Sequence, residues 1–291
     1  MSRMRPTRSI RVALATAATL LGVTVAGATG VPAQGATNSG VNDWGCQPSA
    51  AHPQPVVLWH GLGSNGDADM GAMANNLAQK GYCTYYTTYG TTSYGPYAGG
   101  LASMRTSAAQ LQAFVNQVRT ATGAAKVDIV GHSEGTTVPA YYLKFDGGAA
   151  VVDQFVGYGS NFKGTSLSGL QALADLTGFR PLLDAGGCTA CNEFAPDSSF
   201  MADLDSGGVS VAGPHYTSIV TRYDEAVTPY TSGILAPAPN VTNYTLQDVC
   251  GLDFSGHIAL TVDPNVMALV ANALDPAHAT PVPCVPMPWV S

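Results

Sequence analysis

Residues 131–135 have the types and spacing of a nucleophile held in a sharp turn. They read Gly-His-Ser-Glu-Gly and follow the apolar-rich run of residues 127–130. A serine between two glycines, entered from a buried strand and left by a helix, presents its hydroxyl at the carboxyl end of a sheet. The glycines are needed because a side chain would obstruct the turn. The pattern predicts Ser133 as a nucleophile, and the alternative is a turn serine without chemistry.

A serine hydroxyl is a weak nucleophile, so a base must take its proton and a carboxylate must orient that base. Asp224 follows an expected strand over residues 215–221, and His257 lies in a loop after an expected last strand over residues 241–249. The chain order Ser133, Asp224, His257 is the order of the triad in α/β-hydrolases. We therefore predict these three side chains as a catalytic triad.

Other histidines and acidic residues are less well placed for these roles. Two histidines lie inside turn motifs and are expected to shape the turns rather than to act as bases: His60 and His132. Glu225, next to Asp224, is expected to point away from the site.

The order of the expected elements favours an α/β fold. The apolar run of residues 55–59 is typical of a strand buried on both faces of a parallel sheet. It ends in the Gly-rich turn of residues 60–63, where half of an oxyanion hole is expected. Strands and amphipathic helices then alternate, which predicts a mostly parallel sheet with helices on both faces. Residues 161–213 interrupt this order and are interpreted either as a lid or cap insertion or as a surface excursion.

Residues 1–28 have the composition of a secretory signal peptide. Four arginines precede an uncharged stretch, and cleavage is expected after Ala28 or, alternatively, after Ala33 or Ala36. The remaining residues 29–291 are expected to form a single catalytic domain. Removal of four of the 12 basic residues and none of the 19 acidic ones makes the net charge −11. Such an acidic chain argues against nucleic acid partners.

All six cysteines lie after the expected leader, and an even number in an exported chain indicates disulfides. Sequence order alone does not choose among the possible pairings. We favour three pairs: Cys46–Cys83, Cys188–Cys191 and Cys250–Cys284. The Cys-x-x-Cys spacing of the second pair is also found in redox and metal motifs, but neither a second such motif nor a paired histidine follows it.

The chain resembles the bacterial class 2 lipases, which are secreted α/β-hydrolases, over roughly residues 42–283. The likeness rests on several motifs together: Asn42-Asp43-Trp44, Val56-Val57-Leu58-Trp59-His60-Gly61, Gly81-Tyr82-Cys83, Gly131-His132-Ser133-Glu134-Gly135, Tyr141-Tyr142 and Tyr223-Asp224-Glu225-Ala226-Val227-Thr228-Pro229. The resemblance implies the same triad, and it implies that the backbone N–H groups of Leu62 and Glu134 form the oxyanion hole.

Glu134 departs from the family pattern, which more often has an uncharged residue after the nucleophile. We expect its carboxylate to lie within several ångströms of His257 and to favour the imidazolium, which would move the working range toward alkaline pH. The alternative is a solvated or cation-paired carboxylate without a kinetic role. Gly256 and residues 160–165 also depart from the pattern, and none of these changes removes a catalytic group.

These features predict a secreted, extracellular, monomeric carboxylic-ester hydrolase that works through an acyl-serine and acts on lipid esters as a lipase. We expect no cofactor, no metal, no membrane-spanning segment in the mature form, and transient contact with a lipid–water interface. Two alternatives stay open. One is an acyltransferase or polyester depolymerase with the same triad, and the other is a catalytically inactive secreted binding protein.

Overall fold

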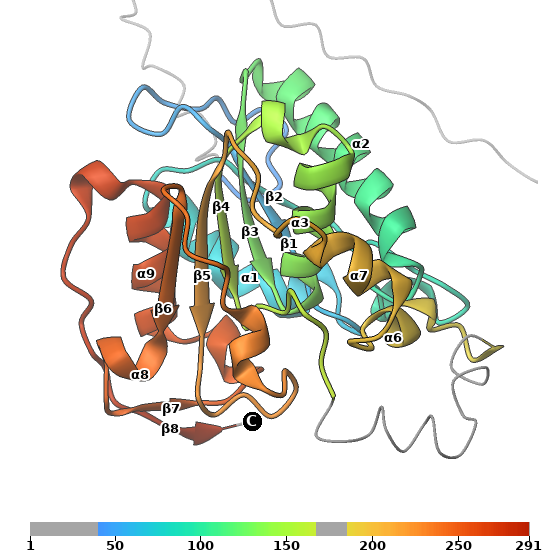
Figure 1. The fold of residues 1–291 in the computed structure, drawn as a ribbon. Coiled ribbons are helices and arrows are strands. Elements are labelled where there is room, and N and C mark those ends of the chain that lie inside the picture. Colours follow the sequence, from blue (N-terminus) through green and yellow to red (C-terminus); the bar gives the residue numbers. More distant parts are fainter. Residues whose placement is uncertain (1–39, 167–184, 291) are drawn as a thin grey trace, which may run out of the picture. The chain divides into compact units, whose positions relative to one another are not determined.

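A six-stranded sheet forms the centre of the protein (Figure 1). The computed structural model describes residues 40–166 and 185–290. Every neighbouring pair of strands, in the order β2-β1-β3-β4-β5-β6, runs parallel, as predicted. The strands are β1 Val56–Trp59, β2 Thr84–Tyr86, β3 Val127–His132, β4 Val152–Tyr158, β5 His215–Val220 and β6 Val241–Thr245.

Helices cover both faces of this sheet (Figure 1). Two pack on one face, α1 Gly66–Gln79 and α9 Pro264–Leu274, and two on the other, α2 Met104–Thr122 and α3 Glu134–Phe145. Alternate residues of β1 contribute to the two cores, because successive side chains of a strand point to opposite faces. No helix within the described ranges is long and apolar enough to cross a bilayer.

The parallel strands bring the predicted site residues to one edge of the sheet. Strand β3 ends at His132, directly before Ser133, and β5 ends at Val220, four residues before Asp224. The turn after β1 begins at His60 on the same edge. Since the carboxyl ends of parallel strands meet at one edge, these three loops lie together, as ligand-binding loops do in open α/β sheets.

The C-terminal part differs from the prediction. The expected strand over residues 241–249 ends as β6 at Thr245, and the helix α8 Leu246–Val249 follows, with Leu246 buried in the core beside α9. Two further strands, β7 Asp253–Ser255 and β8 Met287–Val290, pair in a separate ribbon beyond the carboxyl edge of the sheet (Figure 1). We expected a loop and a Pro-rich tail there. The Cys250–Cys284 disulfide joins the segments that lead into these two strands.

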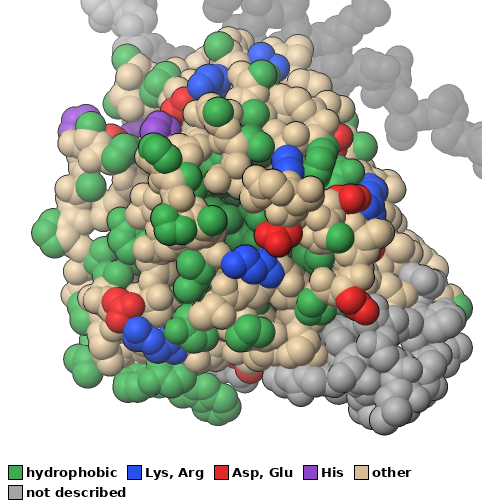
Figure 2. Space-filling model, in the orientation of Figure 1, with side chains coloured by type: hydrophobic (Ala, Val, Ile, Leu, Met, Phe, Trp, Pro, Cys, Tyr) green, Lys and Arg blue, Asp and Glu red, His purple; other side chains and the backbone are tan. Residues whose placement is uncertain are grey.

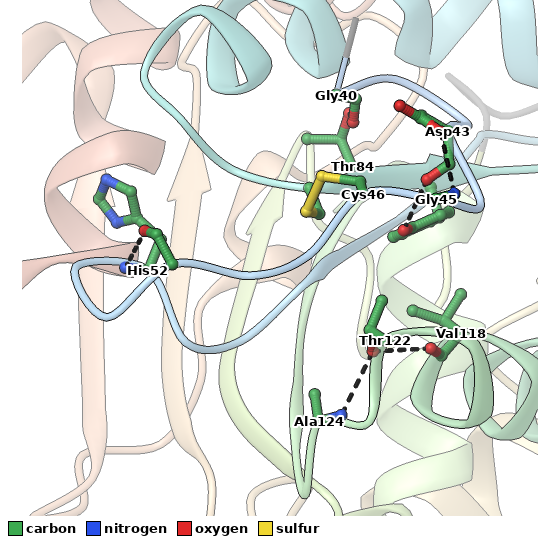
Figure 3. Close-up of a disulfide and its surroundings, with 12 residues drawn as sticks. Gly40, Asp43, Gly45, Cys46, His52, Thr84, Val118, Thr122 and Ala124 are labelled. Atoms are coloured by element: carbon green, nitrogen blue, oxygen red, sulfur yellow. Dashed lines mark hydrogen bonds between the residues drawn. A yellow bond between two sulfur atoms is a disulfide. The ribbon is translucent and has the colours of Figure 1, made fainter. Parts of the chain in front are cut away.

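Three disulfides join the six cysteines, in the pairs that the sequence analysis favours: Cys46–Cys83, Cys188–Cys191 and Cys250–Cys284. Figure 3 shows the first of these, where the segment before β1 lies beside β2. The Thr84 amide donates to the Gly40 carbonyl there, and the Asn42 amide donates to the Thr84 carbonyl. The disulfide and these two hydrogen bonds therefore fix the N-terminal arm along β2, the edge strand of the sheet.

The described part of the insertion is packed against the domain. It contains α6 Thr189–Glu193 and α7 Ser199–Asp205. The Glu193 carboxylate accepts hydrogen bonds from the Met104 amide and the Ser103 hydroxyl at the start of α2, and Lys144 of α3 donates to the Leu204 carbonyl. The expected apolar piece within residues 167–176 and the expected leader lie outside the described residues.

Smaller elements complete the described chain. They are the 3₁₀ turns η1 Gly95–Tyr97, η2 Gly148–Ala150, η4 Tyr230–Gly233, η5 Ala259–Thr261 and η6 Pro276–His278. The turn η5 directly follows the loop that carries His257, so it helps to form the rim of the site.

Candidate active site

Ser133 lies in a strained turn between β3 and α3. Its φ of 55° lies in the left-handed region, which costs a residue with a side chain about 1–3 kcal/mol. The flanking glycines are sterically required: a Cβ on Gly131 would lie 1.8 Å from the Gly135 carbonyl oxygen, and one on Gly135 would lie 1.9 Å from the Trp59 carbonyl oxygen. The close packing of β1, β3 and α3 therefore excludes any other residue at both glycine positions.

His257 and Asp224 form a buried pair at the same edge. The imidazole Nδ1 lies 2.9 Å from Asp224 Oδ2, and both side chains are almost fully buried. The other carboxylate oxygen, Oδ1, accepts from the amides of Ala226 and Val227 at 3.0 and 2.6 Å. Because a carboxylate only accepts, Nδ1 must donate, which leaves the Nε2 lone pair of a neutral imidazole for a proton.

Glu225 contacts the site, contrary to the sequence prediction that it points away. Its Oε2 accepts the backbone N–H of His257 at 3.0 Å. Adjacent acidic residues thus hold the two ends of one histidine, Asp224 the ring and Glu225 the backbone. An acidic pair after a strand was the only sequence signal for this role, and it did not indicate which partner each carboxylate would meet.

The turn after β1 leaves one amide available. The Gly61 amide donates to Asp69 Oδ2 at 2.6 Å and the Gly63 amide to the Gly99 carbonyl at 2.8 Å. The Leu62 amide between them has no acceptor in the described part of the chain. The Glu134 amide is the first N–H of α3, a position without an intrahelical partner. These are the two amides that the resemblance assigns to an oxyanion hole.

The surroundings of the Glu134 side chain differ from those that the sequence analysis expected for an ionised carboxylate. It is fully buried, and a Cβ on Gly100 would lie 2.7 Å from its Oε2. Burial, reinforced by the negative charge of Glu193, raises its pKa well above the usual range, although Tyr89 opposes this shift. Burial therefore disfavours the ionised carboxylate that we expected, and the alternative of a solvated carboxylate was wrong because the side chain is not exposed. Local sequence could not reveal this burial, because it comes from the loop around Gly100.

A second histidine–aspartate pair lies beside the first. His132 Nδ1 is 2.9 Å from Asp69 Oδ1, and both groups are buried. Burial by itself would lower the pKa of His132, but the charge of Asp69 and the hydrogen bond to it outweigh burial and leave the pKa raised. Likewise, burial would raise the pKa of Asp69, but His132 leaves it lowered. His132 was expected to shape its turn, whereas Asp69, on the buried face of α1, was not recognised.

A pocket of about 350 Å³ lies between the loops, and its exposed surface is mainly apolar. Ser133, His257 and Leu62 line it, and its apolar lining includes Phe194, Val227 and Ile258. Within the described ranges, no three His, Cys, Asp or Glu side chains gather in a way that could hold a metal ion.

Two lipases are among the solved structures that share this fold at low sequence identity. Aspergillus fumigatus lipase B superposes with a TM-score of 0.62 at 20% identity, over 81% of this chain and 56% of that chain. The mature Bacillus licheniformis lipase BlEst2 gives 0.50 at 18% identity, over 68% of this chain and 85% of that chain. The chain thus spans little more than half of the fungal lipase. No curated protein matches the sequence.

The family assignment comes from the sequence itself. Residues 53–265, most of the 291-residue chain, match the family model of class 2 lipases. This range contains Ser133, Asp224 and His257, together with the turn after β1. The chain therefore belongs to the class 2 lipase family, and it has the α/β-hydrolase fold.

Proposed function

We propose that this protein hydrolyses lipid esters through an acyl-serine intermediate, with Ser133 as nucleophile, His257 as base and Asp224 as the orienting acid. The observation that carries the proposal is the buried His257–Asp224 pair, whose ring shares one pocket with Ser133. Asp224 holds Nδ1, so the basic nitrogen of the ring is Nε2. An intact, oriented base argues against a catalytically inactive binding protein.

The reaction follows from these positions. His257 takes the proton of the Ser133 hydroxyl as its oxygen attacks the ester carbonyl carbon, and the carbonyl oxygen becomes an oxyanion. The amides of Leu62 and Glu134 stabilise that charge, each by about 2.7–4 kcal/mol. The imidazolium then returns its proton to the leaving alcohol, and water repeats the cycle on the acyl-serine. No cofactor is required for these steps.

The pocket favours an apolar acyl or alcohol group over a charged one. Phe194, Val227 and Ile258 line it, and its exposed surface is mainly apolar. Burial of a hydrocarbon chain against such walls contributes roughly 25 cal/mol per Å² of apolar surface. A fatty ester would gain this free energy along its chain, so lipase activity is the substrate class that we propose.

Contact with a lipid–water interface would occur on the rim of this pocket. Ile258 lines the pocket and yet is 59% exposed, and three further apolar side chains nearby in sequence are exposed: Leu252, Phe254 and Val262. Hydrophobic side chains also gather on the surface in the region of β7 and β8 (Figure 2). We propose that this rim touches the lipid surface transiently while a monomeric enzyme draws in one ester.

We further propose that the protein is secreted and works outside the cell, with the leader removed. The six cysteines are all oxidised in three disulfides, which persist in oxidising compartments.

The decisive experiment compares wild type with Ser133→Ala on soluble nitrophenyl esters of increasing chain length. We expect hydrolysis by wild type and covalent labelling of Ser133 by a fluorophosphonate, and neither in the variant. Hydrolysis by Ser133→Ala at the wild-type rate would refute the mechanism. Product analysis with an alcohol acceptor and with a polyester film tests the alternatives, because an acyltransferase would yield new ester and a depolymerase would release soluble monomers from the film.

A further inference from the structure

Asp69 and His132 form a buried ion pair that no step of the proposed reaction uses. The Nδ1 of His132 lies 2.9 Å from Asp69 Oδ1 and 3.1 Å from Oδ2, and the two side chains are 2% and 5% exposed. Burying two opposite charges costs free energy that a well-packed apolar pair would avoid. This cost indicates that the pair has a role beyond packing.

The other ring nitrogen determines the protonation state of His132. Its Nε2 lies 3.1 Å from the backbone carbonyl oxygen of His257. A carboxylate and a carbonyl are both acceptors, so each ring nitrogen must donate a hydrogen. A neutral ring would point one lone pair at an oxygen. With Asp69 ionised, these contacts favour an imidazolium, which cannot accept a proton from a substrate or from Ser133.

Asp69 extends the same set of contacts to the turn after β1. Its Oδ2 accepts the Gly61 amide at 2.6 Å. Gly61 directly precedes Leu62, which lines the pocket, and His132 directly precedes Ser133. One ion pair therefore connects three separate chain segments, which carry the oxyanion donor, the nucleophile and the base.

We propose that Asp69 and His132 are positioning residues that hold the oxyanion turn and the His257 backbone at fixed distances from Ser133. This inference rests on the proposed function, because it assigns the pair a role in that reaction. A misplacement of about 1 Å among reacting groups can reduce a rate by roughly 10²-fold, so such a device would act mainly on kcat.

Other titratable groups surround the His132 ring. The His257 ring lies 4.8 Å away and the Tyr158 ring is stacked on it at 5.1 Å. The charge of Asp224 raises the pKa of His132, and His132 in turn lowers the pKa of His60. Asp69 is the group in direct contact with Nδ1, so its replacement is the direct test of the charge.

Two substitutions of His132 test the contacts of its two ring nitrogens separately. Asparagine places its amide nitrogen near the position of Nδ1, so His132→Asn keeps a donor for Asp69 and loses the donor for the His257 carbonyl. Glutamine reaches the position of Nε2, so His132→Gln keeps the second donor. We expect kcat on a soluble short-chain ester to fall about 100-fold in His132→Asn and about 10-fold in His132→Gln, with KM changed less than threefold in both.

Asp69→Asn removes the negative charge of Asp69 and keeps its hydrogen bonds to Gly61 and His132. Its side-chain oxygen can still accept the Gly61 amide, and its NH₂ group would donate to Nδ1, which makes His132 neutral with the proton on Nε2. The donor to the His257 carbonyl survives, so we expect at most about a 10-fold loss of kcat. A purely structural pair would instead lower the thermal midpoint of all three variants and leave the kcat of the folded fraction unchanged, as measured by active-site titration.

Nitrogen-15 NMR of the wild-type protein provides a test that needs no variant. We expect both ring nitrogens of His132 to carry hydrogens at pH 7. A neutral His132 ring would overturn the ion pair, and a folded His132→Asn with wild-type kcat would overturn the positioning role. If instead wild type shows no Ser133-dependent hydrolysis, the proposed function fails, and the NMR result still shows whether the ion pair exists.

Discussion

Two histidine–aspartate pairs lie side by side, and only one of them is arranged as a base. In both, the imidazole Nδ1 is 2.9 Å from a carboxylate oxygen and the side chains are buried. The difference lies at the opposite nitrogen. His257 shares the pocket with Ser133, whereas Nε2 of His132 meets a backbone carbonyl. The partner of the second nitrogen therefore decides whether such a pair can transfer a proton or only hold its neighbours.

The two carboxylates also differ in what else they hold. Asp224 accepts two amides from its own loop, Ala226 and Val227, so it is fixed locally. Asp69 lies on α1 and accepts the amide of Gly61, eight residues away in the preceding turn. One acid thus stabilises a single loop, and the other connects a helix to the turn that faces the pocket.

The same chemical change should have opposite consequences in the two pairs, and this is the largest effect we expect. In Asp224→Asn the new amide donates to Nδ1 and leaves the proton of His257 on Nε2, the wrong nitrogen, so kcat should fall about 10⁴-fold. Asp69→Asn gives His132 the same tautomer, which still donates to the His257 carbonyl, so the loss should be about 10-fold or less. Steady-state kinetics on a soluble ester, with concentrations corrected by circular dichroism for folded protein, will measure both. Equal losses would show that the two pairs do not differ as described.

A smaller loss of kcat is expected when the backbone of His257 loses one of its two side-chain contacts. That residue is held at its carbonyl by His132 and at its amide by Glu225. Glu225→Ala removes the acceptor, and the lost bond to a charged group, about 1.5–3 kcal/mol, should lower kcat roughly 10-fold. Glu225→Gln keeps an acceptor oxygen and should lose less.

Asp248→Ala is the matched control for that measurement. Asp248 also lies at this end of the molecule, but it is an exposed acid that pairs with Arg222. Exposed pairs contribute little, so its kcat should stay at the wild-type value. If Asp248→Ala and Glu225→Ala lost activity equally, the effect would come from the net charge of this region and not from the bond to His257.

Glu134 should have the smallest effect on catalysis, because burial raises the pKa of its carboxyl and so favours the neutral form. Glu134→Gln replaces one neutral group by another, so kcat/KM and its pH profile should stay within about twofold of wild type. A profile displaced toward acid in the variant would mean that wild-type Glu134 is ionised.

The pH dependence of the free energy of unfolding should reveal the protonation of Glu134 instead. A raised pKa in the folded state means that the folded protein keeps a proton that the unfolded chain releases. The stabilisation from that proton is fully present below the usual carboxyl pKa and is lost as the pH rises through the folded-state value. Urea unfolding between pH 5 and pH 9 should therefore show Glu134→Gln gaining on wild type as the pH increases. A constant difference across that range would contradict the burial of the proton.

Local sequence was sufficient for the elements near Ser133. The glycines at 131 and 135, the apolar strand before them and the helix after them all follow from short-range rules, and β3 and α3 lie as predicted. The fold class and the class 2 lipase family were also confirmed. The roles of Ser133, Asp224 and His257 remain predictions, although their order along the chain was enough to propose them before their positions in space were known.

Errors occurred where partners come from distant parts of the chain. The strand expected over residues 241–249 turns into α8 because Leu246 is buried in the core beside α9, and β7 forms because the Cys250–Cys284 disulfide brings the chain end beside it. Hydrophobic periodicity describes a segment by itself, and it does not contain such long-range contacts.

The sequence by itself determined which residue types were present and their order: a serine in a turn, an acid after one strand and a histidine near the end of the domain. Only the tertiary structure decided the state of each ionisable group. The loop around Gly100 covers Glu134, and burial raises the pKa of its carboxyl, whereas α1 brings Asp69 to His132 and so raises the pKa of that imidazole. The physical reason is that the charge of a buried group depends on the solvent it has lost and on the partners it has gained, and both come from residues remote in the chain.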